Sequence, residues 1–220
     1  MHDYLTWDKT TLDSYEPETI TEQYSQGYVF GRTGKGDMFQ TRSLRVELSR
    51  FQLSSENRRV TQKFPELKVK SNSLPLTEDE YDWNIHRLGK EFYTKKFGVG
   101  TFSASKLRAI LKDDDSTSFN MLLEYSLEST VGYAICYQNN SIIHYAYPFY
   151  EFELYPANLG MSMMIGAIEF AAEMKLEYIY LGSVKNESDK YKLQFSGLQW
   201  FDGKDWQGDL SVLKKLLVKS

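Results

Sequence analysis

Cysteine is nearly absent from this chain of 220 residues, in which Cys136 is the single example. One cysteine excludes a disulfide within the chain and a metal site built from several cysteines. Cys136 lies in the apolar stretch VGYAICYQ, which predicts a buried strand, so a core thiol is favoured over a nucleophile. The three histidines, at positions 2, 86 and 144, are too scattered to indicate a zinc motif. We therefore expect no metal.

Long apolar runs are also missing. Nowhere do about 18 apolar residues follow one another, so no membrane-spanning helix is expected. The start, MHDYLTWDKT, lacks the basic and then apolar pattern of a signal peptide. These features predict a soluble, cytoplasmic protein with no membrane partner. Its length and its 41% of hydrophobic residues suit an N-terminal arm over residues 1–24 followed by a single domain over residues 25–220.

Charge is unevenly distributed in a chain whose formal net charge is -4. Residues 1–24 carry six carboxylates and one lysine, whereas residues 42–70 carry eight cations and three carboxylates. Such a local excess of positive charge indicates an anionic partner, although cations that only solvate a surface and pair with the acidic arm are an equally open interpretation.

The second half of the chain is rich in strands. Alternating and apolar stretches predict successive strands at residues 119–126, 130–138 and 141–149, a long helix at 158–175 and a strand at 177–184. A final strand at 197–203 and a helix at 209–218 follow. In the first half, the pattern predicts strands and a glycine turn within 27–51, helices at 54–64 and 103–112, and a helix that starts at a Thr77–Glu80 capping box.

A meander of strands, then a helix, then a strand is the core order of the GNAT (acetyltransferase-like) fold. The strands before and after the helix should be parallel neighbours. We therefore predict an α+β protein with a GNAT-like mixed sheet and helices on both faces, in which the two parallel strands splay apart to admit an acyl or aminoacyl donor.

The loop that leads into the long helix is the place where GNAT enzymes hold the pyrophosphate of coenzyme A. Here the loop reads ANLGMS over residues 157–162, and Asn158, Gly160 and Ser162 are the candidate donor-loop residues. This is half of the usual motif, because Ala157 stands in place of Gln or Arg. Gly160 has a second interpretation as a residue that merely allows a tight turn.

Three stretches in the right order resemble the arginyl-tRNA–protein transferases, a family with bacterial leucyl-transferring relatives. The first is LRVELSRFQLSSENRRV, the second is LGMSMMIGAIEFAAEMKLEYIYLG, and the third, which matches more loosely, is DKYKLQFSGLQWFDGKDW. The cysteine cluster and cysteine pair usual in that family have no counterpart in this chain.

The resemblance implies an aminoacyltransferase that uses aminoacyl-tRNA as donor substrate, without a further cofactor. The acceptor would be the α-amine of a protein or peptide. Amide formation from an activated ester requires a neutral amine, correct placement and a stabilised oxyanion. Since the ordinary pKa of an α-amine is about 7.7–8.0, no strong general base is needed.

The resemblance also suggests roles for particular residues. The tRNA phosphates would be bound by cations, and Tyr191 would stack on the terminal adenine. The candidate tRNA-binding residues are Arg42, Arg45, Arg58, Arg59, Lys190, Tyr191 and Lys192. The alternatives are surface ion pairs for Arg58 and Arg59, and loop packing for Tyr191.

The candidates for the chemistry are Tyr180 in the donor tunnel, Ser183 as an oxyanion donor and Glu153 as acceptor of the amine proton. Tyr180 is otherwise a core residue, and Glu153 otherwise a solvated strand end. His144, inside an alternating strand, is expected to be structural.

Two other functions remain open from the sequence. One is a coenzyme A-dependent N-acetyltransferase, which the incomplete donor loop disfavours. The other is a module that binds tRNA or protein N-termini without catalysis.

Overall fold

A computed structural model describes residues 5–32 and 34–218 of the chain. The protein is of the α+β class and forms two compact units. The first unit contains the described residues up to Ser54, Asn139–His144 and the described residues from Ala171 on. The second unit contains Ser55–Gln138 and Tyr145–Phe170. The predicted boundary between an arm and a single domain at residues 24 and 25 stays a prediction.

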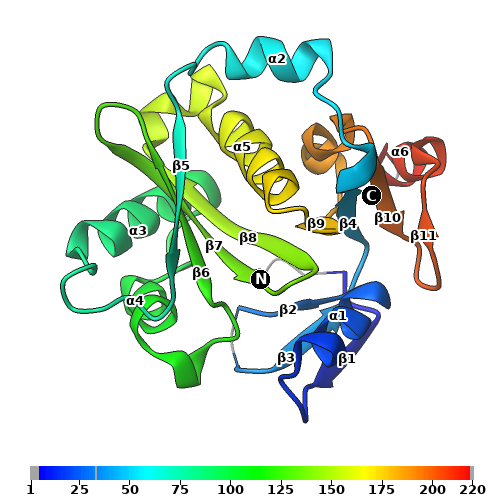
Figure 1. Ribbon diagram of the computed structural model, residues 1–220, viewed down its shortest axis with the longest axis horizontal. Helices are drawn as coiled ribbons and strands as arrows, with labels where there is room; N and C mark the ends of the chain where they lie inside the picture. The colour runs from blue at the N-terminus through cyan, green and yellow to red at the C-terminus, as the bar shows by residue number, and fades with distance from the viewer. Residues whose placement is uncertain (1–4, 33, 219–220) are drawn as a thin grey trace. The chain divides into compact units, whose positions relative to one another are not determined.

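The first unit begins with a small three-stranded sheet in the order β1-β3-β2 (Figure 1). Its elements are β1 (Asp8–Thr11), α1 (Pro17–Ser25), β2 (Tyr28–Phe30) and β3 (Asp37–Gln40). Gly34 and Gly36 adopt positive φ values of 86° and 80° in the turn before β3, as the glycine pattern predicts. The acidic arm thus contains a strand and a helix.

The remainder of the first unit is built around β4 (Ser43–Glu47), which pairs antiparallel with β10 (Leu198–Phe201) and β9 (Tyr178–Ser183). Leu44 and Val46 of β4 are fully buried, whereas Arg45 between them is half-buried, as the alternating pattern predicts. The other elements are the 3-10 helices η1 (Leu48–Arg50) and η4 (Glu187–Gln194), β11 (Trp206–Gln207) and α6 (Leu210–Val218).

The second unit contains β5 (Lys68–Ser73), β6 (Met121–Ser126) and β7 (Thr130–Gln138), which lie side by side and antiparallel (Figure 1). Its helices are α2 (Ser55–Thr61), α3 (Trp83–Phe97), α4 (Ala104–Lys112), η2 (Asp114–Ser116) and η3 (Phe152–Ala157). Cys136 of β7 is fully buried, and burial raises the pKa of its thiol, so the core role is confirmed.

Two elements belong partly to each unit, namely β8 (Ile142–Tyr150) and α5 (Leu159–Glu173). The chain therefore runs through a meander, α5 and then β9, which confirms the predicted GNAT-like order. Parallel pairing between β8 and β9 covers three residue pairs, from Ile142↔Tyr178 to His144↔Tyr180. β8 itself continues to Tyr150 and β9 to Ser183.

The predicted start of α3 is wrong by five residues, because the N-cap is Asp82 and not Thr77, although the capping box itself forms. The Thr77 hydroxyl accepts the Glu80 N–H at 3.3 Å, and a Glu80 carboxylate oxygen accepts the Thr77 N–H at 3.0 Å. These bonds close a turn only, because Asp82 has extended backbone and its side chain caps α3 by accepting the Asn84 N–H at 2.9 Å. The predicted Ser103 cap of α4 is present.

Candidate functional site

The carboxyl end of β9 brings together three of the predicted residues within the first unit. A register shift between Ser43 and Arg45 disturbs the pairing of β4 with β9, and Gly182 there has a positive φ of 74°, which favours glycine. The Val184 N–H donates to the Arg42 carbonyl at 3.0 Å. η4 then returns the chain, so that Lys192 Nζ donates to the Ser183 carbonyl at 3.0 Å.

The turn into η4 is held by a capping box. The Asn186 side chain accepts the Ser188 N–H at 3.0 Å, and the Asp189 carboxylate accepts the N–H groups of Lys185 and Asn186. This turn fixes the position of Lys192 beside Ser183. The sequence pattern did not predict η4, although its Asn-x-x-Asp spacing was a usable signal.

Arg42 is the most unusual cation of this group. Its Nε–H is buried and has no acceptor among the described residues, and burial lowers the pKa of its guanidinium. An arginine remains protonated even so, because its ordinary pKa is above 12. A buried, charged donor without an acceptor is costly, and an anion that accepted from it would relieve that cost.

Arg45 differs from Arg42, because its side chain is enclosed by other residues. The guanidinium carbon lies 4.0 Å from the centre of the Tyr178 ring and 4.1 Å from that of Trp206, and Nε donates to Gln199 at 2.7 Å. This is a cation–π sandwich with a further hydrogen bond. The contacts give Arg45 a packing role, which the strand pattern could not indicate because Trp206 is remote in sequence.

Tyr180 is a core residue. It is 1% exposed, and its ring centre lies 4.8 Å from that of Tyr24 and 5.6 Å from that of Trp206. Burial raises the pKa of Tyr180 to about 12. These contacts show the packing role, and a place for Tyr180 in the donor tunnel stays a prediction.

The Lys190–Lys192 segment of η4 lies beside a groove. Tyr191 is 44% exposed, and Lys190 forms an ion pair with Glu187 at 2.6 Å. The groove has a volume of about 500 Å³ and lies between η4 and α6. Its lining residues are Lys190, Leu193, Lys214, Lys215 and Val218. The two lysines of α6 were missed, although the pair in DLSVLKKLLV was visible in the sequence.

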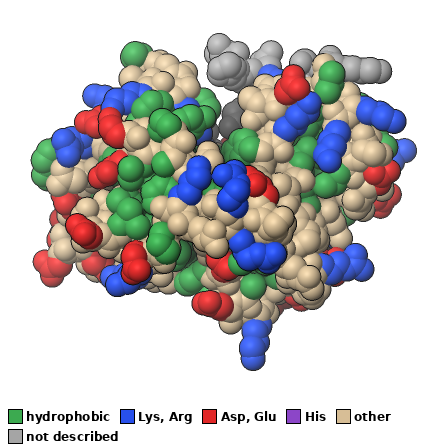
Figure 2. Space-filling model, turned by 90° about the horizontal axis from the view of Figure 1, so that it is seen from above, with side chains coloured by type: hydrophobic (Ala, Val, Ile, Leu, Met, Phe, Trp, Pro, Cys, Tyr) green, Lys and Arg blue, Asp and Glu red, His purple; other side chains and the backbone are tan. Residues whose placement is uncertain are grey.

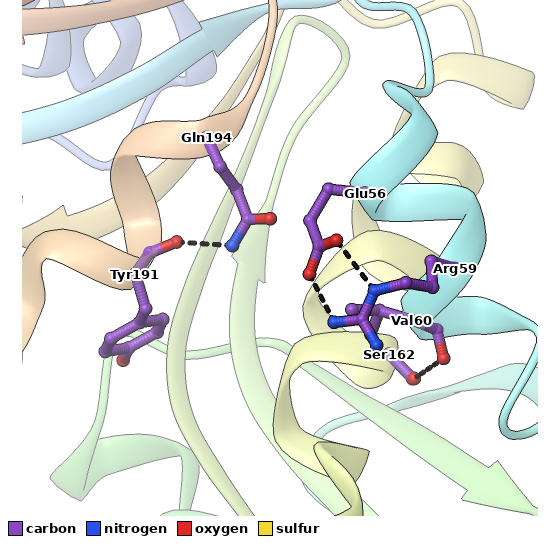
Figure 3. A network of polar contacts seen from close by, with 6 residues as sticks. All are labelled: Glu56, Arg59, Val60, Ser162, Tyr191 and Gln194. Carbon is purple, nitrogen blue, oxygen red and sulfur yellow. Dashed lines mark hydrogen bonds and ion pairs between the residues drawn. The ribbon is translucent and has the colours of Figure 1, made fainter.

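Arg58 and Arg59 lie on α2 in the second unit, and both are exposed. Figure 2 views the face on which α2 lies and shows Lys and Arg side chains in blue among red carboxylates. Two nitrogens of Arg59 donate to the Glu56 carboxylate, at 2.8 and 2.6 Å, as Figure 3 shows. This fork-like pair raises the pKa of Arg59 and lowers that of Glu56, so the surface ion-pair interpretation is correct for Arg59.

The residues of the predicted donor loop make contacts within the protein. A Cβ on Gly160 would lie 2.5 Å from the Tyr150 hydroxyl, so this glycine is required because a tyrosine ring packs against the backbone. Ser162 is 2% exposed, and its hydroxyl donates to the Val60 carbonyl at 3.4 Å (Figure 3). Asn158 ends η3 with a left-handed φ of 70°. A role of this loop in binding the donor stays a prediction.

Glu153 projects from η3 and is paired with Lys95 at 2.8 Å, with its side chain 74% exposed. Lys95 lowers the pKa of this carboxyl group. A carboxylate with a lowered pKa is a weaker base than an ordinary one, so the solvated interpretation suits Glu153 better than proton transfer does.

Comparison with known proteins identifies the family. A profile described as "Arginine-tRNA-protein transferase, C terminus" matches residues 79–202, more than half of the chain. This chain belongs to that family. The matched range includes Glu153, Tyr180, Ser183 and the Lys190–Lys192 segment, and it confirms the resemblance seen in the sequence.

Curated relatives are similar at low identity. An aspartate/glutamate leucyltransferase of Ruegeria pomeroyi is 26% identical over 170 residues, which are 75% of this chain and 61% of that protein. One of Dinoroseobacter shibae is 25% identical over 216 residues, or 90% of this chain and 75% of that protein. The chain thus spans less than two thirds of the Ruegeria relative.

Among solved structures, L-PGS from Bacillus licheniformis aligns with a TM-score of 0.49 and 15% identity, covering 78% of this chain and 52% of that one. FemX aligns with a TM-score of 0.47 and 10% identity, covering 82% of this chain and 63% of that one.

Within the described residues, no helix has the length and apolar character needed to cross a membrane.

Proposed function

We propose that this protein transfers an amino acid from aminoacyl-tRNA to the N-terminal amine of a protein or peptide. Membership of the transferase family over residues 79–202 is the observation that supports this most strongly. The curated relatives are named aspartate/glutamate leucyltransferases, so leucine is the amino acid and an N-terminal Asp or Glu the acceptor that we infer. The reaction would take place in the cytoplasm, where charged tRNA is available.

The chemistry is a balanced exchange of an ester for an amide. The lone pair of a neutral α-amine attacks the ester carbonyl, the carbon–oxygen bond to the ribose breaks, and the ribose hydroxyl leaves with the proton that the amine loses. A fraction of α-amines is neutral at pH 7, since their ordinary pKa is about 7.7–8.0. Placement and oxyanion stabilisation are therefore the main demands on the protein.

Ser183 is the residue we assign to the oxyanion. It ends β9, it is half-buried, and its carbonyl oxygen already accepts from Lys192. That contact positions both residues, so a hydroxyl donor and a cation are available at one strand end. Tyr180, which is buried beneath this end, acts only through packing in this proposal, and Glu153 is a surface residue.

The tRNA phosphates would be bound by Arg42, Lys192 and the lysines of the groove. Arg42 supports this because its buried Nε–H has no acceptor among the residues described here. Lys214 and Lys215 are exposed on the rim of a groove with an apolar floor, which suits a phosphate chain with attached bases.

The deciding experiment is transfer of labelled amino acid from tRNA. Leucyl-tRNA and arginyl-tRNA, each labelled on the amino acid, are incubated with peptides that begin with Asp, Glu or Ala. We expect label on the Asp and Glu peptides from leucyl-tRNA. If label is transferred from arginyl-tRNA instead, the proposed amino acid is wrong, but the proposed reaction is supported.

Two controls separate this reaction from the other functions. Ser183→Ala should lower the rate about 100-fold, a usual effect of losing an oxyanion donor, while tRNA binding stays unchanged. Acetyl-CoA, tested by calorimetry, should not bind. If tRNA binds but no peptide acquires label from either tRNA, the protein is a binding module; if acetyl-CoA binds and tRNA does not, the proposal is wrong.

A further inference from the structure

η3 carries an exposed aromatic residue that the proposed reaction does not use. Tyr155 is 45% exposed although it lies within a stack of rings in the second unit. Its ring centre is 5.4 Å from that of Phe152 with an interplanar angle of 11°, and 6.5 Å from that of Tyr150 with an angle of 6°. Three rings thus share nearly one orientation, and one of them is open to solvent.

The stack is held in place from the inside. Tyr150 is 4% exposed, packs 4.5 Å from the ring centre of Phe92, and lies over Gly160, where no Cβ fits. The glycine of the incomplete donor loop therefore serves this stack. Tyr155 is also fixed through its backbone, because its carbonyl accepts the Asn158 N–H at 3.0 Å. An exposed ring fixed in this way loses little conformational freedom when a ligand stacks on it.

A cation accompanies the open ring. Lys96 of α3 has its Nζ 5.3 Å from the centre of the Tyr155 ring and 5.2 Å from that of Phe97, which is itself 48% exposed. Lys95, the preceding residue, is paired with Glu153. The surface thus combines flat aromatic area with a positive charge, the two features that bind single-stranded nucleic acid without reading its sequence.

We propose that Tyr155 stacks on an unpaired nucleobase at the 3′ end of the donor tRNA and that Lys96 binds the adjoining phosphate. We favour a nucleotide over a protein ligand because the open ring and the adjacent ammonium group match the flat base and the phosphate of one nucleotide. The inference rests on the proposed function only for the identity of the RNA. It replaces Tyr191 by Tyr155 as the residue that stacks on the terminal adenine.

The test uses deacylated tRNA with 2-aminopurine in place of the terminal adenine, since stacking on an aromatic ring quenches 2-aminopurine fluorescence. We expect the wild-type protein to quench it and Tyr155→Phe to do the same. Tyr155→Ala should abolish the quenching and weaken tRNA binding by roughly 5- to 150-fold, the range for loss of one stacked base. Tyr155→Ala removes an exposed side chain, and its thermal unfolding midpoint checks the fold.

Tyr15 provides a matched control in the first unit. It is 47% exposed and has Lys35 Nζ 5.7 Å from its ring centre, so it shares the exposure and the cation of Tyr155. Tyr15→Ala should leave quenching and affinity unchanged. If Tyr15→Ala reduces both as much as Tyr155→Ala does, binding to this tyrosine is not specific and the inference is wrong.

The outcomes also separate this inference from the proposed function. Quenching that survives Tyr155→Ala but is lost in Tyr191→Ala overturns the inference, and label transfer by the same preparation would leave the function intact. Absence of quenching by the wild-type protein overturns it as well. If quenching depends on Tyr155 but no label is transferred, the stacking site is supported and the proposed catalytic function is wrong.

Discussion

His144 should make the stability of this protein depend on pH. It is 3% exposed in β8, and its Nδ1 lies 2.9 Å from the Tyr24 hydroxyl. That hydroxyl also accepts the Phe30 N–H at 3.4 Å. Burial, and after it the charge of Lys192, lowers the pKa of His144 to about 3.

The magnitude follows from the difference between the folded and unfolded states. An unfolded histidine has a pKa of about 6.5. Between that pKa and the folded value of about 3, the unfolded chain binds one more proton than the folded one. The free energy of unfolding therefore falls as the pH falls, by about 1.4 kcal/mol per pH unit. Between pH 7 and pH 5 the loss is about 2 kcal/mol from this group alone.

Urea unfolding at pH 7 and pH 5 measures this difference. The decrease in the free energy of unfolding from pH 7 to pH 5 should be about 2 kcal/mol smaller in His144→Phe than in the wild-type protein, whatever the stability of the variant at pH 7. The carboxylates titrate alike in the two proteins, so they do not contribute to this difference. Tyr24→Phe should keep the wild-type pH dependence, since burial and not the hydroxyl is the main cause of the lowered pKa. A His144→Phe protein with the full wild-type pH dependence would refute this reasoning.

Four further results are expected. Arg45→Lys should lower the free energy of unfolding by about 1–2 kcal/mol in urea, because lysine cannot keep both ring contacts and the hydrogen bond to the neighbouring glutamine. Gly160→Ala should cost about 1–3 kcal/mol in the same assay, and more than Gly166→Ala, whose nearest neighbour would be a methyl group at 3.1 Å. Lys192→Ala should reduce the slope of log affinity for tRNA against log salt concentration by about 0.7–0.9. Filter binding between roughly 50 and 200 mM salt measures this slope, and an unchanged slope would exclude a phosphate contact of Lys192. Glu153→Gln should leave the pH profile of label transfer unchanged, whereas loss of the acidic limb of that profile would make Glu153 a proton acceptor after all.

Much of the fold could be predicted, because local patterns carried the information. The strands of the second half are apolar and bounded by turn residues, and β6, β7, β8 and β9 lie within one or two residues of their predicted limits. The α3 start failed for a physical reason. A Thr-x-x-Glu box satisfies the backbone of one turn, but a helix also needs the following residues to continue it.

The site could be predicted less well, because the partners of a charge are distant in sequence. SLRVE indicated correctly that Arg45 points away from the core face, but not that Trp206 and Tyr178 would enclose it. The burial of the Arg42 Nε–H likewise depends on tertiary packing. Charge counting therefore located a cationic region without telling which cations are available to a ligand.

Two residues of the stretches that resemble the transferase family, Arg45 and Gly160, make contacts that explain them without any ligand. Arg45 joins β4 to β9 and β11 through aromatic rings, and Gly160 admits the Tyr150 ring. Residues of these stretches can thus serve the scaffold, while other side chains are the ones that we propose to bind RNA. Arg42 adjoins β4, and Tyr155 adjoins the loop before Gly160. Ligand contacts in this protein should therefore be sought among side chains that are not already used in packing, whether they lie within these stretches or a few positions outside them.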